Sequence, residues 1–187
     1  MSDSERQPRS VSDLCELEVR GHCPDFLFFW GHRPPRDGGV GAGCLSQWWP
    51  ALFIVSGVLY PSAEHFMMAG KARLFGDEFL ASRIINAPSP GDAKALGRAV
   101  DGFSEELWTA NRYGIVVEGN MAKFGQNPAL LAYLRTTGGR VLVEASSTDR
   151  VWGIGLAADD ERAGRPSRWQ GMNLLGFALM QARGTLG

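Results

Sequence analysis

Residues 60–72 contain a carboxylate and an amine, Glu64 and Lys71, seven positions apart in a sequence typical of a helix. Seven residues make about two helical turns, so both side chains lie on one face, about 10 Å apart along the axis. Met67 and Met68 lie between them, so this face is otherwise apolar. Ionisable groups are costly to bury unless they are paired or take part in chemistry. Two interpretations follow: a reactive pair, or charges that reach solvent from the ends of a core helix.

A second carboxylate, Asp149, follows a Ser-Ser-Thr turn and comes just before Trp152-Gly-Ile-Gly155. A carboxylate on a tight loop beside an indole and two glycines gives a ligand close access to the backbone. The alternative is an Asx turn, in which the side chain accepts hydrogen bonds from nearby backbone N–H groups. The sequence leaves both interpretations open.

Signatures of several other chemistries are missing from the sequence. The Trp152–Gly155 segment lacks the third glycine and the βα context of a dinucleotide-binding fingerprint, and there is no Walker A motif, nucleophile elbow or hydrolytic triad. The three cysteines and three histidines have no metal-ligand spacing, so we expect reduced thiols and no metal site. Most of the six tryptophans are expected in the core, although an indole face can also stack on a nucleobase.

Helical periodicity and capping residues dominate the chain after residue 60. Helices are predicted over residues 62–75, 78–86, 90–100, 104–124, 127–137 and 173–182. Strand patterns are weaker and shorter. They are predicted over residues 26–30, 51–59 and 140–145, with a further extended piece over 149–155 and a short strand or appended tail over 15–20.

These elements indicate a mainly α fold with minor β structure (α+β), as one compact multi-helical domain over residues 13–187. Residues 1–12 are polar and charged, and we expect a disordered tail there. The net charge of −1 gives no sign of a broad nucleic-acid or membrane surface. No apolar run approaches the ~20 residues of a membrane helix, and the start is not signal-like, so a cytoplasmic protein is expected. No obligate protein partner is indicated.

Seven short blocks occur together and in order between about Phe28 and Arg183. They are Tyr60–His65 with Lys71-Ala72, Ala93–Arg98, Trp108 with Arg112, Lys123-Phe124, Leu142–Ser146 with Asp149, Trp152–Gly155, and Asn173–Gly176. Each block is weak alone, but in this order the chain resembles the NADAR family, also called YbiA-like. One block departs from the family: Leu45-Ser46-Gln47-Trp48 stands where the family usually has Leu-Ser-Asn-Phe. This difference affects only the polar contact expected of that Asn, which the side chain of Gln47 is also able to make.

The resemblance implies cleavage of a ribose–nitrogen bond. Members of the family remove ADP-ribose from modified guanine in nucleic acids or nucleotides, a repair-type reaction, while others act on phosphoribosylamino intermediates of riboflavin synthesis. Glu64, Trp108 and Asp149 match family functional positions, and Lys71 matches the lysine implicated as covalent catalyst. Further substrate-binding residues are expected within the matched blocks: Ser46, Arg112, Trp152, Gly153 and Asn173.

A mechanism follows from the resemblance and from the chemistry of these side chains. Lys71, with its pKa lowered by apolar neighbours, attacks C1 of the ribose and forms a Schiff base that water resolves. Glu64 moves protons, and Asp149 orients or activates water. Trp108 and Trp152 form walls of the pocket. No metal or organic cofactor is required.

Arg112 has two interpretations from its position one turn after Trp108. It could bind a substrate phosphate, or it could form an ion pair with a carboxylate in the first turn of the same helix.

Three alternatives to removal of ADP-ribose from guanine stay open at this point. The first is an N-glycosidase for riboflavin intermediates, which the lack of an attached riboflavin-pathway domain and the Gly- and Pro-rich segment 31–43 make less favoured. The second is a non-catalytic module that binds ADP-ribose or NAD, and the third is a helical interaction protein without a pocket. The choice between DNA, RNA and free nucleotide is also open.

Overall fold

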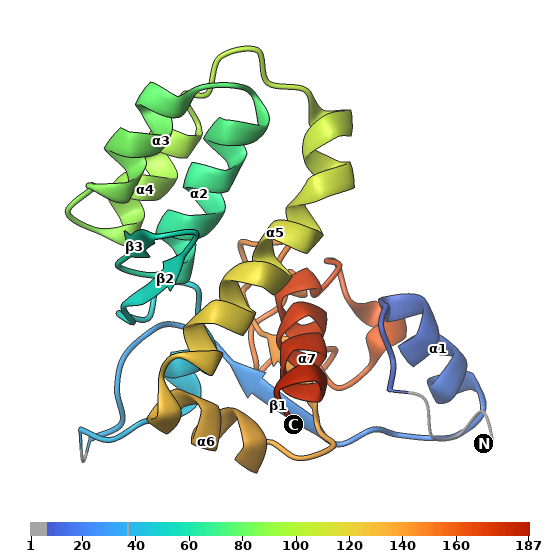
Figure 1. Cartoon of the computed structure of the whole chain (residues 1–187). Helices are drawn as coiled ribbons and strands as arrows, with labels where there is room; N and C mark the ends of the chain where they lie inside the picture. The colour runs from blue at the N-terminus through green and yellow to red at the C-terminus, as the bar shows by residue number, and fades with distance from the viewer. Residues whose placement is uncertain (1–6, 37) are drawn as a thin grey trace. The chain divides into compact units, whose positions relative to one another are not determined.

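The computed structural model describes residues 7–36 and 38–187 (Figure 1). Over these residues the chain forms seven α-helices and two two-stranded sheets, which confirms the mainly α, α+β class. The chain divides into two compact units. The middle unit comprises residues 31–133, and the terminal unit comprises the residues up to Trp30 together with residues 134–185. A single domain over residues 13–187 stays a prediction.

A β-hairpin opens the helical part of the middle unit. Strand β2 (Phe53–Val55) pairs antiparallel with β3 (Val58–Tyr60), where a single strand over residues 51–59 was predicted. That prediction was wrong because Ser56 and Gly57 both have positive φ angles, 51° and 78°. Positive φ at both central residues is the geometry of a tight two-residue hairpin turn, so the β-branched run reverses direction midway.

Four helices follow the hairpin in the middle unit: α2 (Ala63–Leu74), α3 (Glu78–Ile85), α4 (Pro90–Gly97) and α5 (Glu105–Gly125). Each begins after a side chain that accepts a hydrogen bond from a backbone N–H three residues later, which satisfies one of the free donors of a helix start. These caps are Ser62, Asp77, Ser89 and Ser104. Helix α2 packs against α3, α4 and α5, and Figure 1 shows it beside α3 and α4. All four helices were predicted from sequence, although α4 ends at Gly97 rather than Val100.

Glycines on the neighbouring helices allow α2 to pack closely. A Cβ at Gly119 of α5 would meet the Phe66 ring at 2.6 Å, and one at Gly70 of α2 would meet Ile115 at 2.9 Å. A Cβ at Gly97, the last residue of α4, would clash with Met68. Close packing of this kind fixes the rotation of α2, and therefore the direction in which its ionisable side chains point.

The terminal unit is built on two parallel strands. Strand β1 (Phe26–Phe29) pairs with β4 (Val141–Glu144), and Val141, Leu142 and Val143 are buried. Helix α7 (Leu174–Leu186) buries most of its apolar residues, while α1 (Val11–Val19) contacts the short 3-10 helix η3 (Pro166–Arg168). Helix α6 (Pro128–Thr136) connects the sequences of the two units.

Three predictions for the terminal unit need correction. Residues 15–20, expected as a short strand or tail, mostly belong to α1, which begins at Val11 because Ser10 accepts a hydrogen bond from the N–H of Asp13. The expected disordered tail of residues 1–12 therefore overlaps a helix, and its first six residues lie outside the described part of the chain. Residues 149–155 form turns rather than an extended piece.

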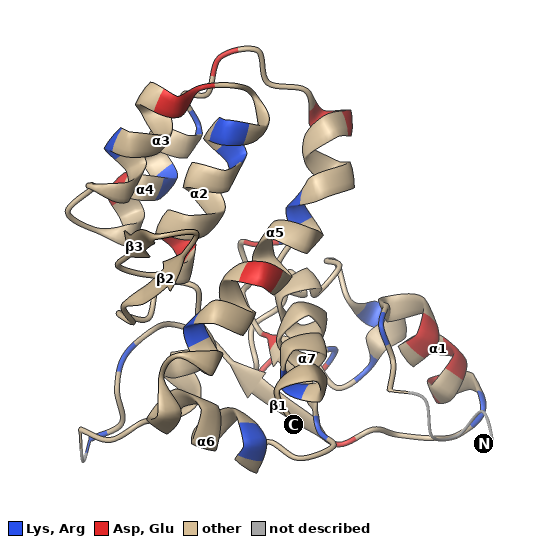
Figure 2. Cartoon of the chain, in the orientation of Figure 1, with Lys and Arg blue, Asp and Glu red and all other residues tan. Residues whose placement is uncertain are grey.

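Charged residues mark two helix ends in the middle unit. Lys71 and Arg73 lie in the last turn of α2, and Glu105 and Glu106 lie in the first turn of α5 (Figure 2). Both arrangements agree with the helix dipole, which favours cations at the C-terminus and anions at the N-terminus. None of the described helices has both the length and the apolar character needed to cross a membrane.

The two glycines inside α5 provide a matched test of this packing. Gly119→Ala should lower the free energy of unfolding by about 1–3 kcal/mol, because the new methyl group would collide with the Phe66 ring. Gly114→Ala in the same helix, where a Cβ meets nothing within 4 Å, should instead raise stability by up to ~1 kcal/mol. Urea denaturation measures both, and equal stabilisation by the two substitutions would contradict the packing argument.

Candidate active site

The amine of Lys71 is held between the end of one helix and two aromatic rings. Its Nζ donates a hydrogen bond of 2.9 Å to the carbonyl of Gly97, the last residue of α4. The same Nζ lies 4.3 Å from the centroid of the Phe103 ring and 5.7 Å from that of Trp108. The side chain is only partly buried, so it combines a fixed position with access to solvent.

Burial lowers the pKa of Lys71, and the smaller effect of the Glu105 carboxylate opposes this shift. A lowered pKa was predicted from the apolar neighbours on α2, and its direction is confirmed. Met67 and Met68 are indeed buried, but the structure adds Phe103 and Trp108 to the surroundings of the amine. A lower pKa gives a larger fraction of the free amine at neutral pH, and the free amine is the nucleophilic form.

Glu64 lies in the first turn of α2 and is only 2% exposed. Its backbone N–H donates a hydrogen bond of 3.0 Å to the carbonyl of Gln47. Both members of the predicted pair therefore lie on one largely buried helix, two turns apart. The interpretation in which both charges simply extend to solvent does not fit a carboxylate buried to this degree.

His65 fixes the start of α2 beside Glu64. Its Nε2 lies 3.1 Å from the carbonyl of Ala87, so Nε2 carries the proton that it donates there. Its Nδ1 then accepts a hydrogen bond from the Ser62 hydroxyl, at 2.7 Å. Burial lowers the pKa of His65, which favours the neutral ring that these two bonds require. We assign His65 to holding the helix start.

Trp108 and Arg112 lie one turn apart on α5, and each is 8% exposed. Nη1 of Arg112 is 3.7 Å from the Glu105 carboxylate, so the ion pair with a first-turn acid is present. The guanidinium is nevertheless buried, while the Glu105 side chain is 71% exposed. A long ion pair with an exposed partner leaves Arg112 able to bind a phosphate as well, and that contact stays a prediction.

Ser46 belongs to a segment that is hydrogen-bonded to buried side chains of α5. Its Oγ accepts a hydrogen bond from the N–H of Trp48. The Nζ of Lys123 donates to the carbonyls of Cys44 and Ser46, each at 2.7 Å. Asn120 donates a further bond of 3.0 Å to the side-chain Oε1 of Gln47. Gln47, which replaces the family's usual Asn, therefore makes a polar contact inside the protein.

Asp149 forms the Asx turn that the sequence left as one alternative. Its Oδ1 accepts hydrogen bonds from the N–H groups of Val151, at 2.9 Å, and Trp152, at 2.8 Å. In an extended strand these two N–H groups would be free to bond to a neighbouring strand. Here Asp149 accepts both, in keeping with the turns that residues 149–155 form. The second carboxylate oxygen takes no part in this turn, and a catalytic role for Asp149 stays a prediction.

Gly153 and Asn173 hold the same loop against β4. A Cβ at Gly153 would lie 2.8 Å from the carbonyl of Glu144, and the Gly153 carbonyl accepts the N–H of Asn173. Asn173 is fully buried with a φ of 51°, donates from Nδ2 to Leu142 and accepts at Oδ1 from the N–H of Glu144. Both ends of its amide are thus bonded to the backbone of β4. This geometry supports a positioning role, and direct substrate contact by either residue stays a prediction.

The predicted site residues fall into two groups. Five of them belong to the middle unit, where α2 and α5 are hydrogen-bonded to the segment around Ser46: Lys71, Glu64, Trp108, Arg112 and Ser46. The remaining four belong to the terminal unit: Asp149, Trp152, Gly153 and Asn173.

Two residues near the site were missed from sequence. Phe103 comes just before the cap of α5, and Trp108 lies in its second turn. Apolar residues at these two positions form the pattern called a hydrophobic staple, and this pattern could have revealed Phe103. Lys123 continues the buried stripe of α5 through Trp108, Arg112, Val116 and Gly119, so its spacing could have revealed its burial.

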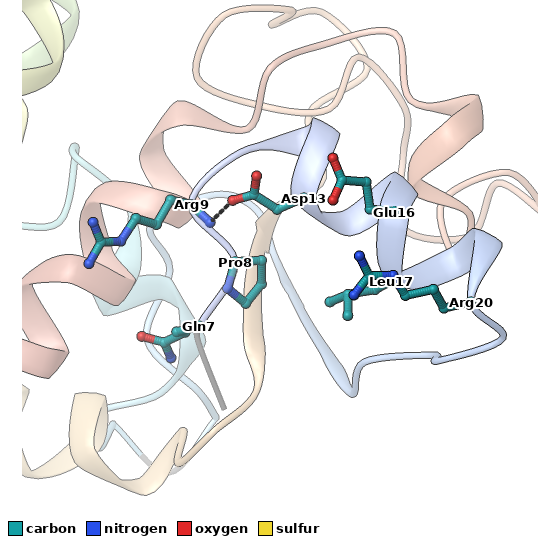
Figure 3. A pocket seen from close by; sticks show the side chains of 7 residues that line it. All are labelled: Gln7, Pro8, Arg9, Asp13, Glu16, Leu17 and Arg20. Carbon is teal, nitrogen blue, oxygen red and sulfur yellow. Dashed lines mark hydrogen bonds between the residues drawn. The ribbon is translucent and has the colours of Figure 1, made fainter. Parts of the chain in front are cut away.

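A separate hollow of about 320 Å³ lies at the beginning of the described chain (Figure 3). Seven residues between Gln7 and Arg20 line it, and the N–H of Arg9 donates a hydrogen bond to the Asp13 carboxylate there. Its lining includes both acidic and basic side chains and none of the predicted site residues. It is therefore not the predicted site.

Residues 28–187 match the NADAR domain family. The chain belongs to this family. It is 40% identical over 163 residues to an N-glycosidase of Acanthamoeba polyphaga mimivirus, a match that covers 84% of this chain and 94% of the viral protein. It is 31% identical to a riboflavin biosynthesis protein of Vibrio vulnificus over 75% of this chain, but this spans only 35% of the bacterial protein. The solved structure of the Escherichia coli protein YbiA is similar, with a TM-score of 0.70, 26% identity and coverage of 87% of this chain and 85% of YbiA.

Membership of the NADAR family confirms the resemblance predicted from the seven sequence blocks. The blocks that carry Lys71 and Glu64 lie inside the matched range, on the buried face of α2. The N-terminal helix α1 lies before that range, so it is an addition to the NADAR part of the chain.

The aromatic ring over the Lys71 amine gives a prediction that does not depend on any substrate. Phe103→Leu should lower the pKa of Lys71 further, because the substitution keeps apolar bulk but removes the ring electrons that stabilise the ammonium form. Competitive labelling of lysine amines across a range of pH, read by mass spectrometry, measures this pKa. Phe79→Leu, at an exposed aromatic residue of α3, is the matched control. An unchanged or raised pKa in Phe103→Leu would refute the proposed ring contact.

Proposed function

We propose that this NADAR chain is a cytoplasmic N-glycosidase that hydrolyses the ribose–nitrogen bond of ADP-ribosylated guanine. The observation that carries the proposal is the Lys71 amine, which has a lowered pKa and a fixed place beside Phe103 and Trp108, on the same helix as the buried Glu64. A binding site alone has no need of a nucleophilic amine. Relatives named N-glycosidases support the same class of reaction.

The reaction begins with attack of the Lys71 lone pair on C1 of the ribose. The bond from C1 to the guanine nitrogen breaks, and its electron pair leaves with the nitrogen, which takes up a proton. Nζ then gives up a proton, and its electron pair forms an iminium with C1 as the bond from C1 to O4 breaks, with O4 taking a proton. Water adds to C1, and the resulting carbinolamine expels the Lys71 amine and releases the free sugar. One water molecule is consumed and the enzyme is regenerated.

The Gly97 carbonyl orients the amine for this attack. A neutral amine keeps two N–H bonds, so one can remain on the carbonyl while the lone pair faces the substrate. The ring of Phe103 and that of Trp108 limit where the lone pair can point. Pre-orientation of a nucleophile is a large part of enzymatic rate enhancement, since it replaces an entropy cost at the moment of reaction.

The other residues of the proposal move protons, bind the substrate or orient water. Glu64 delivers the proton to the leaving nitrogen and later receives one from water. Trp108 stacks on the ribose or base, Arg112 binds a phosphate, and Ser46 lines the substrate site. In the terminal unit, Asp149 orients water through the oxygen that its Asx turn leaves unused.

The remaining contacts of the proposal also belong to the terminal unit. Trp152 supplies a further stacking surface, and Gly153 and Asn173 approach the substrate through the loop that they hold against β4. No metal or organic cofactor takes part in this scheme.

A second candidate is an N-glycosidase for phosphoribosylamino intermediates of riboflavin synthesis. The relative from Vibrio vulnificus favours it by name, although this chain spans about a third of that protein. The same amine and carboxylate would serve, since the bond that breaks also joins ribose C1 to nitrogen. The two substrates differ in the group beyond the ribose, so a direct comparison separates them.

The wild-type protein should release ADP-ribose from ADP-ribosylated guanosine much faster than it releases ribose phosphate from a phosphoribosylamino pyrimidine. Liquid chromatography with mass spectrometry measures both products in parallel reactions. Release only from the pyrimidine would favour the second candidate. No release from either, with a melting temperature raised by ADP-ribose, would instead indicate a binding module.

Borohydride added during turnover should trap a sugar adduct on Lys71, because it reduces the iminium to a stable secondary amine. The chain has three lysines, Lys71, Lys94 and Lys123, so peptide mass mapping assigns the adduct. Lys71→Ala should lose the adduct and lower kcat by roughly hundredfold or more, whereas the control Lys94→Ala should retain both. Near-normal turnover by Lys71→Ala, without any trapped product, would exclude the nucleophile assignment.

A further inference from the structure

Lys123 is a buried cation that the proposed reaction does not use. Its side chain is 0% exposed and lies in the last turn of α5. In the described part of the chain its hydrogen-bond partners are two backbone carbonyls, those of Cys44 and Ser46, rather than a carboxylate. An amine in this position is costly to bury, and a methionine of similar length would fill the space without that cost. The two hydrogen bonds therefore indicate that Lys123 has a role beyond filling space in the core.

The two carbonyls lie at the end of the short 3-10 helix η2 (Ala42–Leu45), where carbonyl groups lack partners within the helix. Lys123 satisfies them and thereby fixes the chain at Cys44 and Ser46. Asn120, one turn earlier on α5, holds the next residue through its bond to the Gln47 side chain. Two side chains of one helix thus hold the four-residue stretch Cys44–Gln47, at two backbone carbonyls and one side chain.

The held stretch in turn contacts the start of α2. The carbonyl of Gln47 accepts the backbone N–H of Glu64, at 3.0 Å. This N–H is one of the donors that a helix leaves free in its first turn, so Gln47 acts as an additional cap at Glu64. Any shift of the Cys44–Gln47 stretch would move this acceptor and loosen the turn that carries the buried carboxylate.

We infer that Lys123 is a positioning residue for Glu64, acting through the Cys44–Gln47 backbone that it holds. This inference rests on the proposed N-glycosidase function, in which Glu64 moves protons. Lys123 does not touch the substrate in this scheme. Its effect is on the placement of a carboxylate, and a displacement near 1 Å in a catalytic group can cost about a hundredfold in rate.

Lys123 can hold the backbone whether its amine is protonated or neutral. Burial lowers the pKa of Lys123 to about 7, and the facing Cys44 thiol has its own pKa raised by burial to about 11, so the thiol stays uncharged. The ammonium has three N–H donors and the neutral amine has two, which is enough for two carbonyls. The hold on the backbone therefore persists when the proton is lost.

The same pKa makes stability depend on pH. Below about pH 7 the amine is protonated in both the folded and the unfolded chain. Between about 7 and its ordinary pKa of 10.5, only the unfolded chain keeps the proton, so the contribution of Lys123 to stability rises with pH. Lys123→Met should remove this part of the rise.

Lys123→Met should lower kcat by about tenfold or more because Glu64 is misplaced, and any rise in KM should not exceed that of Ser46→Ala, since Ser46 is the one proposed substrate contact on the held stretch. Hydrogen exchange should show the Glu64 amide losing at least about tenfold in protection, with the Ala81 amide of α3 unchanged. Ile84→Ala, a buried substitution on α3, is the control for lost stability alone and should leave kcat near the wild-type value. Asn120→Leu removes the hydrogen bond to the Gln47 side chain and should give the same loss of kcat and of Glu64 amide protection. This variant replaces Lys123→Met if Lys123→Met does not fold.

A double variant separates positioning from general damage. Glu64→Gln alone should lower kcat about tenfold or more, and adding Lys123→Met should then cost little further, since the positioned group is already gone. Losses that multiply in the double variant, or an unchanged Glu64 amide in Lys123→Met, would overturn the inference. If the wild-type protein cleaves no ribose–nitrogen bond, the proposed function fails, and amide exchange still decides whether Lys123 holds Glu64.

Discussion

Backbone carbonyls at helix ends hold both important lysines of the middle unit, and the arrangement of the candidate site depends on this interaction. A helix leaves its last carbonyls without partners inside the helix, and their partial negative charge favours a cation. The end of α4 supplies the Gly97 carbonyl to Lys71, and the end of η2 supplies the Cys44 carbonyl to Lys123. Among the described residues neither amine forms an ion pair with a carboxylate, and Glu105 has only the smaller effect on the pKa of Lys71. An amine held in this way loses its proton more readily than an amine in a tight ion pair.

Gly97 joins the packing of the helices to the chemistry of the amine. Its missing side chain gives Met68 the space to pack, and this lets α2 and α4 approach closely. Its carbonyl then lies within hydrogen-bond distance of Lys71 on the same helix as Met68. A larger residue at this position would separate the helices and move the acceptor from the amine at once. The position of the reactive group is therefore a consequence of helix packing rather than of a flexible loop.

Much of this arrangement was predictable from local sequence, and the rest depended on contacts between distant residues. The caps and periodicity around Ser62 were enough to place Glu64 and Lys71 on one buried helix. The acceptor for Lys71 lies 26 residues away in sequence, and the Lys123 bond to Cys44 spans 79 residues, so no local pattern contained them. The hairpin was missed because Ser56, unlike glycine, seldom adopts a positive φ. Helix α1 was missed because its single fully buried residue, Leu14, gives a weak apolar pattern.

Access, rather than acidity, distinguishes the two lysines. Burial lowers the pKa of both, so the direction of the shift does not select either lysine as the nucleophile. Lys123 is fully enclosed, and an electrophile cannot reach it without unfolding its surroundings. Lys71 is partly exposed beside Phe103, whose ring is itself 44% exposed. The chain thus uses one kind of contact, amine to helix-end carbonyl, for two purposes. Where the amine is open to solvent it can react, and where it is closed off it can only hold the backbone.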